Sequence, residues 1–204
     1  MSESGRYPVP ARIHRVEETI QRSRFITVLA HAPDADAAHA FVDRMREEHP
    51  DATHHCWAFV AGSPGSTTHM GMSDDGEPHG TAGRPMLTAL LHGGVGETVA
   101  VCVRYYGGTK LGTGGLSRAY SGGAKLALES LPTRERVERV SMEVTVGYPD
   151  VDGLQRLLDE LEIEVEEEDY GVRVRYRCGV PEESVGAFES AVADLTRGEG
   201  RVSR

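Results

Sequence analysis

The chain has 204 residues, of which 39% are hydrophobic and 26% charged, and its formal net charge is −10. The composition is typical of a folded globular protein and excludes a disordered chain. The negative charge argues against a protein that binds nucleic acid nonspecifically over its whole surface. No apolar run approaches the ~18 residues of a membrane span. The polar N-terminus lacks the apolar core of a secretory signal. The three cysteines are widely spaced, so they predict neither disulfides nor a zinc site. We therefore expect a cytoplasmic protein with no membrane association, metal ion or cofactor.

Charge is unevenly distributed along the chain. Residues 1–137 contain 14 basic and 15 acidic residues, a balance of −1, whereas residues 138–204 contain 8 and 17, a balance of −9. Such asymmetry predicts two domains with different surfaces. We place them at residues 12–132 and 138–204, with a linker at 133–138.

The first domain is predicted to mix strands and helices. The strands are short apolar or alternating runs, and the helices show a 3.6-residue apolar period. The expected elements are a strand at 24–30, a helix between Asp34 and Pro50, strands at 54–61 and 68–72, a helix at 85–91, a strand at 98–106 and a helix at 116–131.

The second domain has a more regular pattern. In chain order we expect a strand at 140–148, a helix after Asp150, a strand from Ile163, a charged turn at 166–169, a strand at 172–180, a helix after Pro181 and a weak strand at 201–203. This β-α-β-β-α-β order is the ferredoxin-like arrangement. The predicted fold class is therefore α+β.

Three arginines alternate along the third strand of that domain. They are Arg173, Arg175 and Arg177. The ferredoxin-like topology places their strand between the strand of Glu143 and the strand of Glu164 and Glu166, so opposite charges would face each other. An RNA-binding stripe is the alternative, but RNA-binding sheets expose aromatic side chains and this face offers none. We favour a cross-strand charge ladder.

A glycine-rich segment, Arg104-Tyr-Tyr-Gly-Gly-Thr-Lys-Leu-Gly-Thr-Gly-Gly-Leu116, joins a buried strand to a helix. Glycines leave backbone amides uncovered, and a helix N-terminus presents unpaired N–H groups, so the segment predicts an anion site. No Asp or Glu occurs between Thr98 and Leu128, whereas four basic residues do. In the alternative interpretation the glycines only permit close packing. The candidate ligand-binding residues are Arg104, Tyr105, Tyr106, Gly107, Gly108, Lys110, Gly112, Gly114, Gly115 and Arg118.

Known nucleotide and hydrolase motifs do not fit this segment. Lys110 precedes the second glycine of a would-be P-loop, the dinucleotide-binding pattern fails at its last position, and the serine-hydrolase elbow near Ser117 lacks its final glycine.

A second candidate segment follows the strand at 68–72 and contains Asp74, Asp75 and Glu77. Carboxylates could hold Mg²⁺ for phosphoryl chemistry, could bind another ligand, or could cap a surface loop, and we favour the capped loop. His54 and Arg84 complete this possible second segment. Because His54 and His55 are adjacent on a strand, they point to opposite faces, which disfavours a metal ion shared by both.

Four motifs, in this order, resemble the IMPACT/YigZ family: His54-His-Cys56, Ser73-Asp-Asp-Gly-Glu-Pro78, Gly80-Thr-Ala-Gly83 and the glycine-rich segment. The resemblance implies an N-terminal domain like ribosomal S5 domain 2 and a ferredoxin-like C-terminal domain. This pair is similar to the last two domains of translation elongation factor G. Eukaryotic relatives regulate translation through an additional module. For bacterial two-domain members the resemblance implies a cytoplasmic protein that contacts nucleic acid or the ribosome, with no established catalytic residues.

We therefore predict a non-enzymatic, translation-associated protein that contacts RNA, the ribosome or a translation-related protein through the glycine-rich segment. Arg104, Lys110 and Arg118 would contact phosphates, and Tyr105 or Tyr106 would stack on a base.

Two alternatives remain open. One is a metal-dependent hydrolase or phosphoryl-processing enzyme that uses Asp74, Asp75 and Glu77, and the other is a protein-interaction module that uses the charged second domain. A groove lined by both candidate segments would make a shared site credible.

Overall fold

The computed structural model describes residues 5–204, which divide into two compact units. The first unit runs from Tyr7 to Arg136, and the second runs from Val137 to Arg204 and also includes Gly5 and Arg6. Both units combine helices with antiparallel sheets, so the chain has the expected two-domain α+β fold. No helix among the described residues combines the length and the apolar character that crossing a bilayer requires.

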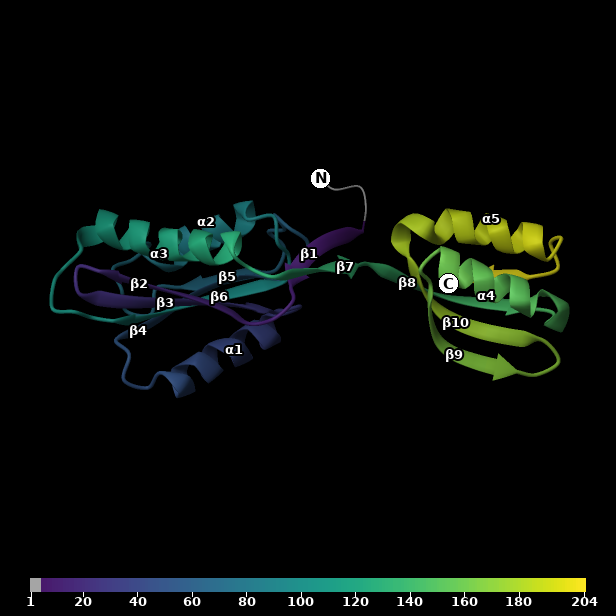
Figure 1. Cartoon of the computed structure of the whole chain (residues 1–204), viewed down its shortest axis with the longest axis horizontal. Helices are drawn as coiled ribbons and strands as arrows, with labels where there is room; N and C mark the ends of the chain where they lie inside the picture. Colours follow the sequence, from purple (N-terminus) through teal and green to yellow (C-terminus); the bar gives the residue numbers. More distant parts are fainter. Residues whose placement is uncertain (1–4) are drawn as a thin grey trace. The chain divides into compact units, whose positions relative to one another are not determined.

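The first unit is built on a five-stranded antiparallel sheet. Its strands, in spatial order, are β2 (His14–Ile20), β3 (Ser23–His31), β6 (Thr98–Tyr105), β4 (His54–Val60) and β5 (Met70–Ser73). One face is covered by α1 (Ala35–Glu48), and the other by α2 (Gly83–His92) and α3 (Gly112–Glu129) (Figure 1).

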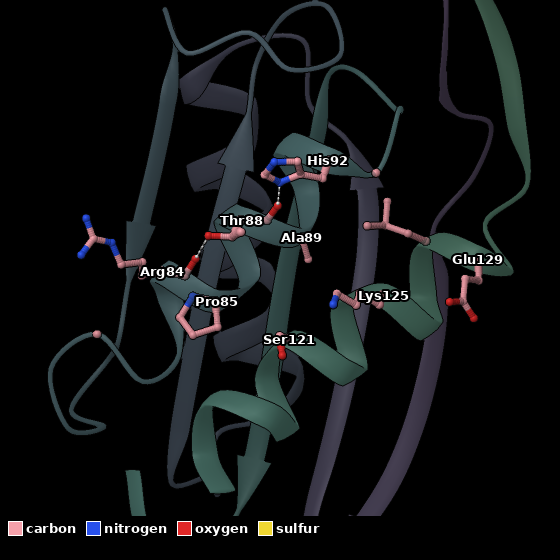
Figure 2. Close-up of a pocket in the computed structure, with 11 residues that line it drawn as sticks. Arg84, Pro85, Thr88, Ala89, His92, Ser121, Lys125 and Glu129 are labelled. Carbon is pink, nitrogen blue, oxygen red and sulfur yellow. Dashed lines mark hydrogen bonds between the residues drawn. The ribbon is translucent and has the colours of Figure 1, made fainter. Parts of the chain in front are cut away.

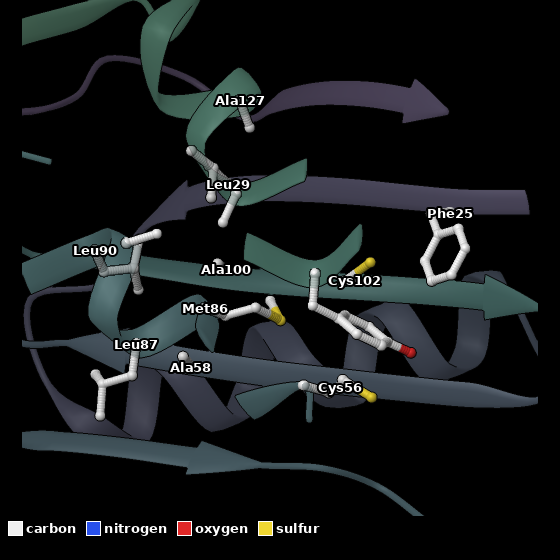
Figure 3. Close-up of a cluster of buried hydrophobic side chains, with 14 of the residues drawn as sticks. Phe25, Leu29, Cys56, Ala58, Met86, Leu87, Leu90, Ala100, Cys102 and Ala127 are labelled. Carbon is white, nitrogen blue, oxygen red and sulfur yellow. The ribbon is translucent and has the colours of Figure 1, made fainter. Parts of the chain in front are cut away.

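The central strand β6 explains this layering. Its valines, Val99, Val101 and Val103, pack toward α1, whereas Ala100 and Cys102 face α2 and α3 (Figure 3). A strand covered on both faces is a nearly continuous apolar run. The alternating valines of one face predicted this strand. The small residues on one face allow two helices to pack close to the sheet.

The second unit contains a four-stranded antiparallel sheet with two helices. In chain order its elements are β8 (Arg139–Val146), α4 (Val151–Glu160), β9 (Glu164–Tyr170), β10 (Val174–Pro181), α5 (Val185–Leu195) and β11 (Arg201–Ser203). The spatial strand order is β11-β8-β10-β9, which confirms the predicted ferredoxin-like topology.

The predicted charge ladder is confirmed for Arg175 and Arg177 but not for Arg173. Arg175 lies 2.6 Å from Asp169 on β9 and 3.9 Å from Glu143 on β8. Arg177 lies 3.8 Å from Glu166 and also contacts Glu167. Arg173 precedes β10 and donates instead to the backbone carbonyl of Glu199, so it is not part of the ladder.

Two local predictions were wrong. Residues 166–169 belong to strand β9 and not to a turn, because pairing with β10 satisfies their backbone and places the arginines beside their carboxylates. Residues 133–138 are not only a linker, because β7 (Thr133–Val137) pairs with β1 (Arg6–Pro10) in a two-stranded sheet. The acidic run at 166–169 resembles a turn in sequence, and the strand partner of β7 lies far away in the chain, so neither segment carried a local strand signal.

The helix after the glycine-rich segment also begins earlier than predicted. It starts at Gly112 and not at Leu116. Gly112, Gly114 and Gly115 therefore form its first turn, where the low helix propensity of glycine hid them from sequence analysis.

Candidate functional site

A cavity of about 450 Å³ opens where the segment after β6 passes the loop between β5 and α2. We call it the β6–α3 pocket. It brings together residues from both candidate segments, namely His54, Glu77, Arg104, Tyr106, Lys110 and Gly112. Strand register explains part of this convergence, because His54 on β4 lies directly opposite Arg104 on β6.

The floor of the pocket is a buried ion pair. Arg104 is 4% exposed and donates from Nη1 to Glu77 Oε1 at 2.6 Å. Tyr120 on α3 donates its hydroxyl proton to the same oxygen at 2.7 Å. Arg104 also donates from Nη2 to Ser23 Oγ at 3.2 Å. Its Nε is buried without a hydrogen-bond partner. Because both Nη atoms are occupied and the side chain is desolvated, we assign Arg104 a structural role in place of the phosphate contact that the sequence suggested.

Two aromatic rings enclose the Arg104 guanidinium. The ring of Phe25 lies 5.2 Å from its central carbon, and the ring of Tyr106 lies 5.3 Å away. Tyr106 is itself 45% exposed. Its ring therefore covers the Arg104 guanidinium with one face, and the exposed part of the ring is available to a ligand.

The other polar groups near the floor stay uncharged. Burial raises the pKa of the Tyr120 hydroxyl, which therefore remains a proton donor to Glu77. Burial also raises the pKa of the Cys56 thiol, which donates to the carbonyl of Asp74 at 3.0 Å. A thiol held protonated in this way is a packing group and not an activated nucleophile.

The mouth of the pocket is positively polarised. Helix α3 begins at Gly112 with no side-chain cap and no acidic residue in its first turn, so its first N–H groups and the positive end of its dipole remain available. The exposed Lys110 and Thr113 lie on the same lining. This arrangement can accept an anion such as a phosphate.

The glycines of the segment serve different purposes. A Cβ on Gly107 would lie 1.9 Å from the carbonyl oxygen of Arg22, so this glycine permits close packing. Gly108 and Gly112 have positive φ values of 82° and 71°, which shape the turn into α3. Gly114 and Gly115 lie within the first turn of the helix. Close packing therefore explains Gly107, and the other glycines shape the turn and the start of α3.

Several candidate residues lie outside the pocket. Tyr105 faces α1, where its hydroxyl lies 2.9 Å from His49 Nδ1. Arg118 and Gly115 border a smaller cavity beside β2. Arg84 borders a groove of about 660 Å³ between α2 and α3, which also contains Lys125 (Figure 2).

The three carboxylates of the second segment have separate partners. Asp74 accepts bonds from the backbone N–H groups of Gly80, Ala82 and Gly83 and so caps the start of α2. Burial acts to raise the pKa of Asp74, but these amides outweigh it and hold the pKa below its usual value. Asp75 accepts from the backbone N–H of His55 at 2.6 Å.

These contacts support the capped-loop interpretation. Glu77 forms the ion pair with Arg104, and Asp74 caps the start of α2. Asp75 accepts a hydrogen bond from the backbone of strand β4. Within residues 5–204, no group of three or more His, Cys, Asp or Glu side chains is placed to hold a metal ion. Nothing in the arrangement favours a metal-dependent hydrolase.

The two adjacent histidines point to opposite faces, as their strand requires. His54 Nδ1 donates to the carbonyl of Asp75 at 2.7 Å, and its Nε2 lies 4.0 Å from Glu77 Oε2. His55 Nε2 lies 3.1 Å from the carbonyl of His49, and burial lowers the pKa of His55.

Sequence reasoning missed five residues that line the pocket. They are Thr53, Pro78, Leu111, Thr113 and Leu116. Leu111 and Thr113 alternate with the chosen glycines and could have been included on that ground. The others carry no local signal of a site.

Together, the fold and the pocket define a class of two-domain α+β proteins with a polar pocket at the start of a glycine-rich helix. Residues 21–128 match the Impact N-terminal domain, and residues 144–199 match a domain of unknown function, DUF1949. The chain belongs to the IMPACT family.

Relatives of similar length support this assignment. The chain is 46% identical to the IMPACT family member YigZ of Escherichia coli strain K12 over 190 residues, which cover 93% of both chains. It is 42% identical to an IMPACT family member of Haemophilus influenzae, with coverage of 94% of this chain and 93% of that one. A crystal structure described as that of a hypothetical protein matches with a TM-score of 0.73 and 45% identity, covering 97% of this chain and 96% of the other.

Proposed function

We propose that the protein is a non-enzymatic, cytoplasmic RNA-binding protein associated with translation, and that the β6–α3 pocket holds one nucleotide. One observation carries this proposal: the uncapped start of α3 and Lys110 lie on the same pocket as the exposed ring of Tyr106. A phosphate fits the first two features, and a base stacks on the third. The link to translation and the cytoplasmic location extend what the family resemblance implies.

The electrostatics of the pocket support an anionic ligand. No acidic residue occurs between Thr98 and Leu128, and the negative charge of Glu77 is offset by Arg104 at 2.6 Å. Residues 138–204 have a formal net charge of −9, which disfavours nonspecific binding along a polyanion such as RNA. We therefore expect local binding that involves only one or two phosphates.

Binding of a short single-stranded RNA, measured by fluorescence anisotropy over a salt series, tests the proposal. The logarithm of affinity should fall with the logarithm of salt concentration with a shallow slope of about −1. Lys110→Glu should weaken binding at low salt by about tenfold or more, because it removes a cation from the pocket and adds a charge that repels phosphate.

The matched control is Lys125→Glu. Lys125 lies on α3, which begins just after Lys110, but it lines the groove between α2 and α3, so this variant makes the same charge change outside the pocket. It should bind RNA nearly as well as the unmodified protein. Absence of RNA binding, or equal losses in the two variants, would overturn the proposal.

A further inference from the structure

One oxygen of a buried carboxylate in the β6–α3 pocket lacks a hydrogen-bond donor. The Glu77 side chain is 3% exposed, and its Oε1 accepts both the Arg104 and the Tyr120 bonds. Its Oε2 accepts no hydrogen bond from any residue of the described range 5–204, and His54 Nε2 lies 4.0 Å away. Glu77 Oε2 is not among the fully buried atoms of the described residues, so it is open to the pocket, and a ligand that supplies a donor to it would gain a hydrogen bond to a charged group.

His54 presents a second acceptor beside this oxygen. Its Nδ1 faces a backbone carbonyl, which can only accept, so Nδ1 must carry the proton. In the neutral imidazole, Nε2 is then an acceptor. Two acceptors cannot satisfy each other, and 4.0 Å exceeds hydrogen-bond length. The lining of the pocket therefore offers two neighbouring acceptors to a ligand.

The charges around the two acceptors favour neutral donors over a cation. Arg104 already offsets the charge of Glu77, and Lys110 and the positive end of α3 lie on the same lining. These groups would repel an ammonium or guanidinium ligand. Hydroxyl groups supply protons without adding positive charge.

We propose that Glu77 Oε2 and His54 Nε2 accept hydrogen bonds from the 2′- and 3′-hydroxyls of a 3′-terminal ribonucleotide. This inference rests on the proposed function and specifies its ligand. Adjacent hydroxyls of one ribose match two adjacent acceptors, and only a strand end has both hydroxyls free. A volume of about 450 Å³ also suits one nucleotide better than a continuous strand.

The test uses the full-length protein and four probes of the same sequence, each labelled at the 5′ end. One is RNA, one is RNA with a 2′-deoxy terminal nucleotide, one is RNA with a 3′-phosphate, and one is DNA. The last three should bind about 10- to 100-fold more weakly than the RNA, because each lacks a hydroxyl that would donate to one of the two acceptors. These comparisons need no protein variant.

His54→Ala should weaken RNA binding and reduce the difference between the ribo- and 2′-deoxy-terminated probes severalfold. His92→Ala is the control, because His92 lies in the groove between α2 and α3. It should leave both binding and the difference unchanged.

The outcomes separate the two proposals. Equal binding of all four probes, with the Lys110→Glu effect retained, would overturn the ribose inference and leave RNA binding in place. No binding of any probe would overturn both. A difference between probes that His54→Ala leaves intact would also contradict the assigned acceptors.

Discussion

Glu77 and Arg104 are charged residues in a position where the fold otherwise places apolar groups. They lie between the sheet and α3, and a tyrosine hydroxyl and two aromatic rings complete their surroundings. A buried ion pair of this kind adds little net stability compared with an apolar pair, but losing one partner is costly. We infer that the pair is retained for the polar floor that it gives the pocket.

Arg104→Met should therefore destabilise the protein, because it leaves Glu77 buried without its counter-charge. We expect the free energy of unfolding, measured in urea, to fall by about 3–5 kcal/mol. The double variant Arg104→Met/Glu77→Leu should recover much of that loss. A single variant as stable as the unmodified protein, or a double variant no better than the single one, would contradict this account.

Helix α3 contains two neighbouring glycines with opposite surroundings. A Cβ on Gly123 would lie 2.5 Å from Thr27 Oγ1 on β3, whereas nothing lies within 4 Å of a Cβ on Gly122. Gly123 thus sets how closely the helix approaches the sheet. Gly122 has no such role and only lowers the helix propensity.

Gly122→Ala should raise the stability of the protein by about 0.5–1 kcal/mol, because alanine has a smaller entropy cost in a helix. Gly123→Ala should lower it, because the helix must shift away from Thr27. Thermal unfolding of both variants measures the difference. If both substitutions raised the melting temperature, the close approach of α3 to β3 would be refuted.

Each of the two units has its own hydrophobic core. The core of the second unit is formed by residues between Val140 and Val202, with the fully buried Phe188 and Tyr176 among its largest side chains. None of the buried residues in that cluster belongs to residues 7–136. This separation suggests that the second unit folds without the first.

A fragment of residues 137–204 should therefore fold alone. We expect helix and strand signals in far-ultraviolet circular dichroism and a single cooperative transition in urea. Phe188→Ala should cost the fragment about 3–5 kcal/mol and largely unfold it. A fragment that lacks a cooperative transition would show that its core depends on the first unit.

Local sequence patterns predicted much of the secondary structure and the strand order of the second unit. Apolar periodicity predicted α1 between Asp34 and Pro50 and the buried strand β6, and it predicted the ferredoxin-like order of the second unit. The charge ladder followed from that order. These features depend on neighbouring residues and short connections, so the sequence by itself contains their signal.

Only the tertiary structure determined which residues meet at the pocket. His54 lies opposite Arg104 because of the β4–β6 register, and Glu77 reaches Arg104 across 27 positions of sequence. Burial then turned Arg104 from a candidate phosphate contact into part of the floor. Strand register and desolvation depend on distant parts of the chain, so no local pattern could reveal them.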